Sequence, residues 1–212
     1  MKYVVGWVHL LFCMVSLAAT PIDGLYTSVL GGYTYMPPNI NQTSGNATLN
    51  SAKYQKGYDV GGEIGYKSNP MRYAGEISYL KTNINQFYLN DNLQTTPSGY
   101  GQALIGMANI YYDVPNMNPI LQPLLGVGIG YGWMQAKLRA EGPTLITDFS
   151  AQNSTFAYQG MAGLTYNFAE NYALSLWYRY LGTTRLSQFG ELFQAHTANA
   201  SATYRFDGNN YK

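Results

Sequence analysis

The 212-residue chain contains few charged residues, few histidines and almost no cysteine. Asp, Glu, Lys and Arg make up 11% of it, against about 25% in ordinary soluble domains. The single cysteine is Cys13, and the two histidines are His9 and His196. Such a chain offers no disulfide framework and no His/Cys cluster of the kind that holds a metal. We therefore expect no metal and no cofactor.

Long hydrophobic runs are also missing after the first residues. Beyond residue 20, no stretch of about 18–20 apolar residues could cross a bilayer as a helix. Hydrophobic residues nevertheless make up 46% of the chain, with 21 tyrosines and 23 glycines, which argues against intrinsic disorder. Acidic and basic residues nearly balance, 11 against 12, so we expect no nucleic acid partner. This composition favours a β-barrel with a lipid-facing surface.

The N-terminus has the features of a secretory signal peptide. Lys2 precedes a mostly apolar stretch from Val4 to Leu17, and small residues follow at Ala18 and Ala19. This order of a basic start, an apolar core and small residues is typical of a cleaved export signal. The alternative, a membrane-anchoring helix, would require a longer apolar segment. We expect residues 1–19, with Cys13, to be removed, leaving residues 20–212 as one barrel domain.

Between Gly24 and Phe206 the chain reads as eight strands joined by alternately long and short connections. The long connections are residues 37–52, 85–98, 137–155 and 182–195, and the short ones are residues 68–70, 114–120 and 169–171. Outer-membrane barrels place tight turns on the periplasmic side and longer loops outside. The sequence therefore predicts an all-β fold, an eight-stranded antiparallel up-and-down transmembrane β-barrel with both termini in the periplasm.

Within the strands, apolar and polar residues alternate, as expected where one face of a barrel wall meets lipid. In the second strand, Tyr58, Val60, Ile64 and Tyr66 alternate with Asp59, Glu63 and Lys67. In the fifth, every inward position from Gly126 to Gly132 is a glycine. Glycines let a strand bend, or leave room for large lumen side chains such as Tyr111. A nucleotide-binding glycine motif is disfavoured, because no helix pattern follows it.

Aromatic residues gather toward both ends of the expected strands. Near the short connections lie Tyr66, Tyr73, Tyr112, Tyr166, Phe168, Tyr172, Tyr204 and Phe206. Toward the long connections lie Tyr33, Tyr35, Tyr58, Tyr79 and Trp133. Two such belts are expected at the two interfaces of a membrane. The ordinary strand propensity of tyrosine would explain the number of these residues but not their placement.

The inward positions include two acidic residues and one basic residue that the topology brings together. The turn at residues 68–70 sets Glu63 and Glu76 at similar height, and Arg179 can reach them across a narrow lumen. Two neighbouring carboxylates need a cation or a proton, and the planar guanidinium can bridge both. We expect an ion-pair network of Glu63, Glu76 and Arg179 that fills the lumen. The alternative is an acid/base pair or an ion path.

Several segments carry a resemblance to a known family. They are residues 107–115 (MANIYYDVP), 125–132 (LGVGIGYG), 158–168 (YQGMAGLTYNF) and 176–181 (LWYRYL). These resemble the outer-membrane protein β-barrel family of opacity-type surface antigens, which includes the OmpA-type barrel. In the last strand, Asn199, Ser201, Tyr204 and Phe206 resemble the C-terminal signal that the barrel assembly machinery recognises. Six residues follow Phe206, which departs from the strict form of that signal.

The resemblance implies a surface protein of a Gram-negative outer membrane, with an adhesion, host-interaction or structural role carried by the long loops. The alternatives are a narrow channel for small solutes and a lipid-modifying enzyme. Lipid A deacylases use a His and, two residues on, a Ser, but here His196 is followed at that spacing by Ala198; we expect no enzyme. Lys137, Arg139 and Arg185 lie near the strand tops, where we expect them to contact lipopolysaccharide phosphates. Host surface molecules are further expected partners.

Overall fold

The computed structural model describes residues 21–37, 42–44, 47–89, 92–93, 97–115, 120–141, 146–184 and 193–206. All regular secondary structure in these residues is β-strand. In the same residues there is no helix that is long and apolar enough to cross a membrane. The expected signal peptide, residues 1–19, lies outside the described residues.

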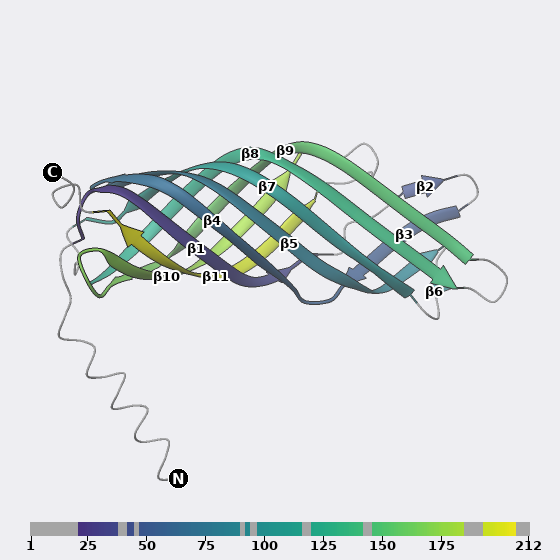
Figure 1. Cartoon of the computed structure of the whole chain (residues 1–212). Coiled ribbons are helices and arrows are strands. Elements are labelled where there is room, and N and C mark those ends of the chain that lie inside the picture. Colours follow the sequence, from purple (N-terminus) through teal and green to yellow (C-terminus); the bar gives the residue numbers. More distant parts are fainter. Residues whose placement is uncertain are drawn as a thin grey trace, which may run out of the picture.

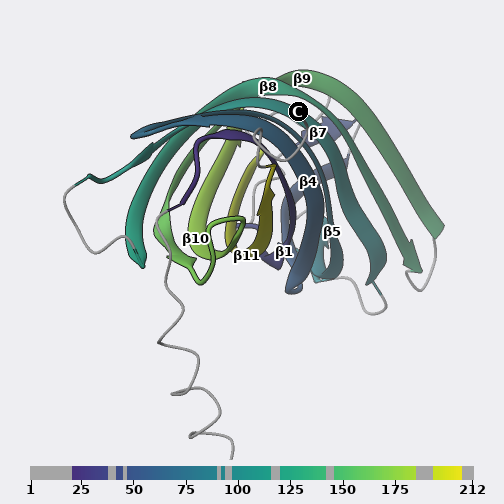
Figure 2. The same cartoon turned by 60° about the vertical axis from the view of Figure 1, so that its left-hand side comes forward.

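Eight strands form the wall of a closed barrel. They are β1 (Gly24–Tyr35), β4 (Gly57–Ser68), β5 (Met71–Leu89), β7 (Pro97–Asp113), β8 (Leu121–Glu141), β9 (Ile146–Asn167), β10 (Tyr172–Thr183) and β11 (Gln194–Arg205). Each is antiparallel to both of its neighbours, and the pairing of β1 with β11 closes the ring. Figures 1 and 2 show these strands curving around a common axis. The predicted eight-stranded antiparallel barrel is confirmed.

The two ends of the barrel differ. At one end, called here the turn end, short connections join β4 to β5, β7 to β8 and β9 to β10, where the sequence predicts them. At the other, the loop end, β5, β7, β8 and β9 run past the ends of β1, β10 and β11 (Figure 1). The strands β2 (Gln42–Ser44), β3 (Ala47–Tyr54) and β6 (Asn92–Leu93) lie there, and β3 pairs with β5.

Three of the four long connections, 37–52, 85–98 and 137–155, are shorter than predicted, because much of their length is strand. The predicted loop 137–155 is the clearest case: β8 continues to Glu141 and β9 begins at Ile146, and the two pair to their ends. Likewise, the predicted loop 37–52 contains β2 and most of β3. Alternation marks only the stretch of a strand that has lipid on one side. Past that stretch the pattern fades, although backbone hydrogen bonding to the neighbouring strand continues.

The outer face of the wall carries a band of aliphatic side chains between two aromatic belts. The aliphatic band includes Val29, Ile64, Ile77, Leu125, Val127, Ile129, Leu174 and Leu176, all exposed. Toward the turn end lie Tyr66, Tyr73, Tyr112, Tyr172 and Phe206, and toward the loop end Tyr33, Tyr35, Tyr58, Trp133 and Tyr178. This arrangement gives the outside of the barrel the surface that a bilayer requires.

The glycines of β8 face inward and admit side chains from the neighbouring strand. A Cβ on Gly126 would come within 2.6 Å of the Tyr111 ring, and a Cβ on Gly128 would overlap Asn109. These pairs lie directly opposite each other on β7 and β8. Of the two reasons that the sequence leaves open for the glycines, room for lumen side chains therefore applies here.

Candidate functional site

Among the residues that the structure describes, eight charged side chains are buried in the lumen, four acidic and four basic. The acidic ones are Asp59, Glu63, Glu76 and Asp113, and the basic ones are Lys67, Arg72, Arg179 and Arg205. All come from wall strands, at inward positions of the alternating pattern. Because a charge in a poorly solvated space is costly unless it is paired and hydrogen-bonded, their arrangement decides how the interior is held together.

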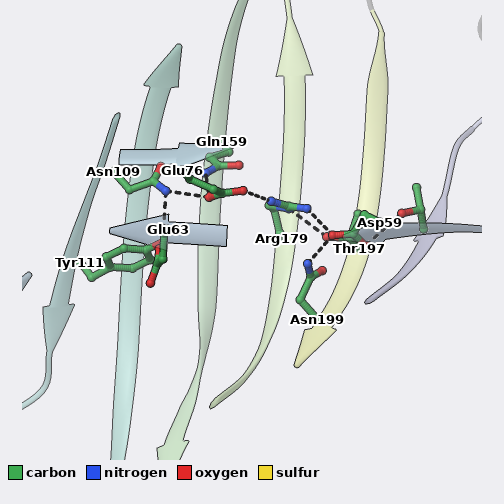
Figure 3. Close-up of polar contacts among 10 residues, drawn as sticks. Asp59, Glu63, Glu76, Asn109, Tyr111, Gln159, Arg179, Thr197 and Asn199 are labelled. Atoms are coloured by element: carbon green, nitrogen blue, oxygen red, sulfur yellow. Dashed lines mark hydrogen bonds and ion pairs between the residues drawn. The ribbon is translucent and has the colours of Figure 1, made fainter. Parts of the chain in front are cut away.

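Arg179 on β10 lies at the centre of the larger polar cluster, and its side chain is only 1% exposed. Its Nη1 is 2.6 Å from Glu76 Oε1 on β5, and its Nη2 is 2.5 Å from Asp59 Oδ2 on β4 (Figure 3). Its Nε donates to the Thr197 hydroxyl on β11. One guanidinium therefore ties together strands from opposite sides of the ring, as its planar fork of donors allows.

Amide side chains complete the hydrogen bonding of both carboxylates. Asn109 and Gln159 donate to Glu76 Oε2 over 2.7 and 3.1 Å, and Asn199 donates to Asp59 Oδ2 over 2.5 Å. Gln159 also donates to Asn109 Oδ1. Figure 3 shows this chain of contacts running across the lumen from β7 to β11. A buried network in which most members are satisfied in this way rigidifies the interior.

The predicted trio of Glu63, Glu76 and Arg179 differs from this arrangement in one member. Glu63 and Glu76 are direct partners across β4 and β5, at the similar height that the sequence predicts. However, Arg179 contacts Asp59 rather than Glu63, and Glu63 accepts a hydrogen bond of 2.8 Å from the Tyr111 hydroxyl. The stagger of strands around a closed barrel sets which residues of β4 and β10 are level, and the sequence does not show it.

A second charged cluster closes the turn end of the lumen. Lys67 Nζ is 2.6 Å from Asp113 Oδ2, and Arg72 Nη2 is 2.9 Å from Asp113 Oδ1. Arg72 also lies over the Tyr111 ring, 4.9 Å from its centroid. Arg205 donates to Asn167 Oδ1 over 2.7 Å. This cluster was not among the predicted sites, although Lys67, Arg72 and Asp113 all occupy inward positions in the alternating pattern of β4, β5 and β7.

Toward the loop end the lumen holds a hydrophobic cluster that the sequence pattern did not predict. The buried residues there are Met36, Leu80, Ala103, Ile105, Met107, Met134, Ala136, Ala157, Leu181 and Ala195. Phe193 packs against them. Following the inward parity further along each strand would have shown its change from polar to apolar residues. The interior thus has an apolar layer at the loop end. Both charged clusters lie toward the turn end, with a smaller hydrophobic cluster of Tyr26, Ala74, Tyr111, Leu124 and Met161.

Buried side chains of the described wall strands occupy much of the interior at the levels of these clusters. An eight-stranded barrel is just wide enough to be filled in this way. Among the described residues no three His, Cys, Asp or Glu side chains are placed to hold a metal ion. The described contacts across the interior are ion pairs and hydrogen bonds between strands, beside apolar packing.

His196 lies on the outer face of β11, close to its loop end. The Tyr178 hydroxyl and His196 Nδ1 are 2.5 Å apart, and the rings of Tyr35 and Tyr180 lie 6.2 and 5.4 Å from the imidazole. All of its described contacts are with tyrosines. Such a setting at the loop-end aromatic belt suits a half-polar ring at a membrane interface.

Of the three expected lipopolysaccharide contacts, the structure describes the side chain of one. Lys137 is exposed on the outer face of β8. Arg139 lies two residues further along β8, and its side chain is not among those described. Arg185 lies outside the described residues.

Three residues of the expected assembly signal lie in β11, on both of its faces, and the fourth, Phe206, directly follows the strand. Asn199 and Ser201 are buried in the lumen, where Asn199 contacts Asp59. Tyr204 faces outward, 5.1 Å from the Tyr172 ring and 5.0 Å from the Phe206 ring. The same residues therefore also contribute to the polar network and to the aromatic belt at the turn end.

Sequence comparison gives matches over most of the chain. The family model described as "Outer membrane protein beta-barrel domain" matches residues 8–206. An outer membrane protein of Gluconacetobacter diazotrophicus is 27% identical over 186 residues, which cover 78% of this chain and 48% of the relative. An uncharacterized protein of Brucella abortus is 32% identical over 161 residues, covering 66% of this chain and 56% of that protein. The chain spans about half the length of these curated relatives.

Structure comparison supports the same architecture. Neisserial surface protein A has a TM-score of 0.56 at 17% identity, covering 86% of this chain and 97% of that one. The outer membrane protein OprG of Pseudomonas aeruginosa has a TM-score of 0.53 at 10% identity, covering 88% and 99%. At these identities the likeness shows the fold alone.

Proposed function

Because this chain belongs to the outer membrane protein β-barrel domain family, we propose that it is a surface protein whose specific contacts are made beyond the membrane. The barrel would anchor it, with the turn end in the periplasm and the loop end outside. Its adhesive, host-binding or structural role would be carried by the extension at the loop end. This extension comprises β2, β3, β6 and the outer parts of β5, β7, β8 and β9.

The observation that carries this proposal is the packing of the lumen. Arg179 is 1% exposed and joins carboxylates of β4 and β5, and Leu80 in the apolar layer is 0% exposed. A wall-to-wall network with an apolar layer above it supports an anchor rather than a narrow channel. A filled lumen would leave the part of the molecule that projects from the membrane to make the specific contacts.

Partners of three kinds follow from this proposal. Outer-membrane lipid would surround the aliphatic band, and the barrel assembly machinery would insert the chain through its last strand, with Asn199, Ser201, Tyr204 and Phe206. Surface molecules of a host would meet the extension. Residues 1–19 would direct export and be removed.

The test is a comparison of cells that display the whole barrel with cells that display a trimmed one. In the trimmed barrel, residues 38–54 are replaced by a short Gly/Asn turn, which removes β2 and β3 and leaves the wall strands intact. Adherence to cultured epithelial cells and to immobilised matrix proteins should fall, while heat-modifiable gel migration confirms that both barrels are folded. A cell expressing the lumen variant Leu80→Val serves as the control with an unchanged extension.

Two results would overturn the proposal in favour of the alternatives. Equal adherence of the trimmed and whole barrels, with discrete single-channel conductance in planar bilayers, would indicate a channel. A change in the mass of lipid A when the protein is deleted from its host would indicate a lipid-modifying enzyme.

A further inference from the structure

The outer face of β5, β7 and β8 changes from apolar to polar along one row of residues. Below the row, toward the turn end, lie the exposed side chains of Ile77, Leu104 and Trp133. The row itself is a chain of hydrogen bonds. The Tyr79 hydroxyl donates to Gln102 Oε1, and Gln102 Nε2 donates to Gln135 Oε1, each over 2.9 Å. Amides cannot face hydrocarbon at low cost, so this row marks the outer boundary of the hydrophobic band.

Two lysines stand directly beyond this boundary, on either side of one aromatic ring. Lys81 Nζ on β5 lies 5.3 Å from the centroid of the Tyr100 ring. Lys137 on β8 is the direct cross-strand partner of Tyr100. A cation held against a tyrosine face loses part of its freedom and keeps its charge at a fixed place. Tyr100 thus holds the Lys81 ammonium in place, and the register of β7 and β8 sets Lys137 beside the same tyrosine on the outer surface.

A third lysine extends the same area onto the next strand. Lys56, immediately before β4, is exposed, and its Nζ lies 5.6 Å from the centroid of the Tyr33 ring. The backbone N–H of its neighbour Gln55 donates to the carbonyl of Asn83, which follows Lys81 on the outer face of β5. Lys56, Lys81 and Lys137 therefore lie on one stretch of the outer surface from β4 through β5 and β7 to β8, called here the lysine patch. The Lys56 ammonium lies at the β1 side of this patch, and Lys81 and Lys137 lie at the β7 side.

No described carboxylate shares this surface. The acidic residues of the wall whose side chains are described, Asp59, Glu63, Glu76 and Asp113, all point into the lumen. There they are matched by four basic residues. The described outer face of β4, β5, β7 and β8 up to Lys137 thus carries positive charge only. Clustered ammonium groups repel one another, so the patch is complementary to a ligand with several negative charges.

We propose that the lysine patch binds the phosphate groups of lipid A, the lipid anchor of lipopolysaccharide in the outer leaflet. The inference rests on the outer-membrane surface location in the proposed function. A phosphate attached to acyl chains comes to rest where the apolar band ends, which is the height of the patch. Lys81 and Lys137 would hold one phosphate beside Tyr100, and Lys56 would contact a second or a neighbouring headgroup. Lysine ammonium groups suit phosphate as compact charges.

The experiment measures lipid binding by the folded barrel in zwitterionic detergent. Titration with bisphosphorylated lipid A, monophosphoryl lipid A and phosphatidylglycerol, followed by native mass spectrometry, gives apparent dissociation constants. The test variant is Lys81→Gln/Lys137→Gln, and Lys81→Arg/Lys137→Arg keeps the charge. The matched control, Lys53→Gln/Lys212→Gln, removes the same number of positive charges at two lysines that the proposal does not invoke.

Removal of Lys81 or Lys137 alone should weaken binding of bisphosphorylated lipid A about fivefold, and removal of both about 25-fold. The arginine pair and the control pair should bind within about twofold of the unaltered barrel, and raised salt should reduce the difference. Monophosphoryl lipid A should bind more weakly than the bisphosphorylated form. Circular dichroism and heat-modifiable migration establish that each variant is folded.

Three outcomes would overturn the proposal. The glutamine pair could bind as tightly as the unaltered barrel, the control pair could lose as much as the glutamine pair, or phosphatidylglycerol could bind as tightly as lipid A. The last result would make the patch a general anionic surface. None of these outcomes depends on the adherence assay, so failure of the lipid site and failure of the proposed adhesive role are distinguishable.

Discussion

The central role of Arg179 in the lumen can be tested by replacing it with methionine, which keeps the length of the side chain and removes its charge. In the native barrel the guanidinium lies 2.5 Å from Asp59 and 2.6 Å from Glu76, at 1% exposure. Removing one partner of a buried ion pair leaves an uncompensated charge and costs about 3–5 kcal/mol. Since whole domains are stable by about 5–15 kcal/mol, Arg179→Met should visibly weaken the barrel.

The carboxylates left behind determine where in this range the loss should fall. Asp59 would keep its hydrogen bonds from Asn199 and Thr34. Glu76 would keep those from Asn109 and Gln159 to Oε2, but its Oε1 would lose its described donor. These remaining partners soften the penalty, and we expect about 3 kcal/mol. The triple variant Asp59→Asn/Glu76→Gln/Arg179→Met removes the unpaired charges and should recover at least about 2 kcal/mol.

Urea unfolding in phospholipid vesicles measures both effects. Fluorescence of Trp133 and Trp177 follows the transition, and heat-modifiable gel migration reports the folded fraction independently. The reasoning would be refuted if Arg179→Met lost less than about 1 kcal/mol, or if the triple variant were no more stable than the single one. Either result would mean that the ion pairs do not hold the strands together.

Two matched pairs test the packing of the wall. Gly128→Ala should lower the free energy of unfolding by about 1–3 kcal/mol, because the added Cβ overlaps Asn109, whereas Gly106→Ala has nothing within 4 Å and should be neutral or slightly stabilising in the same urea assay. Leu80→Ala, at 0% exposure, should cost about 2–5 kcal/mol. Leu104→Ala, at 49% exposure, should cost clearly less, because lipid tails refill the space. Equal losses of unfolding free energy within either pair would contradict the assignment of these residues to the lumen or to the lipid-facing side.

The faces of the strands were predictable because alternation is a local property. Successive side chains on a strand point to opposite sides, so the choice of Tyr58 and Ile64 for lipid and Glu63 for the lumen needed no knowledge of other strands. The short turns were predictable for the same reason. Strand length was not, because β8 and β9 continue as a hydrogen-bonded pair to Glu141 and Ile146, where no lipid imposes a pattern.

The pairing inside the lumen was only half predictable. The two-residue turn between β4 and β5 sets Glu63 opposite Glu76, which a count along the chain reproduces. Arg179 lies three strands from β4 around the ring, through β1 and β11, and the register shift accumulates along that path. Its partner on β4 is therefore Asp59 and not Glu63.

The sequence by itself determined that this chain forms an eight-stranded outer-membrane type of barrel, with charge inside and aliphatic and aromatic side chains outside. It could do so because composition and period-two alternation are read along a single strand. Only the tertiary structure decided which lumen charges meet, that an apolar layer covers them, and that Lys56, Lys81 and Lys137 share one surface. Those facts depend on how strands far apart in the chain are aligned, and closure of the ring fixes that alignment.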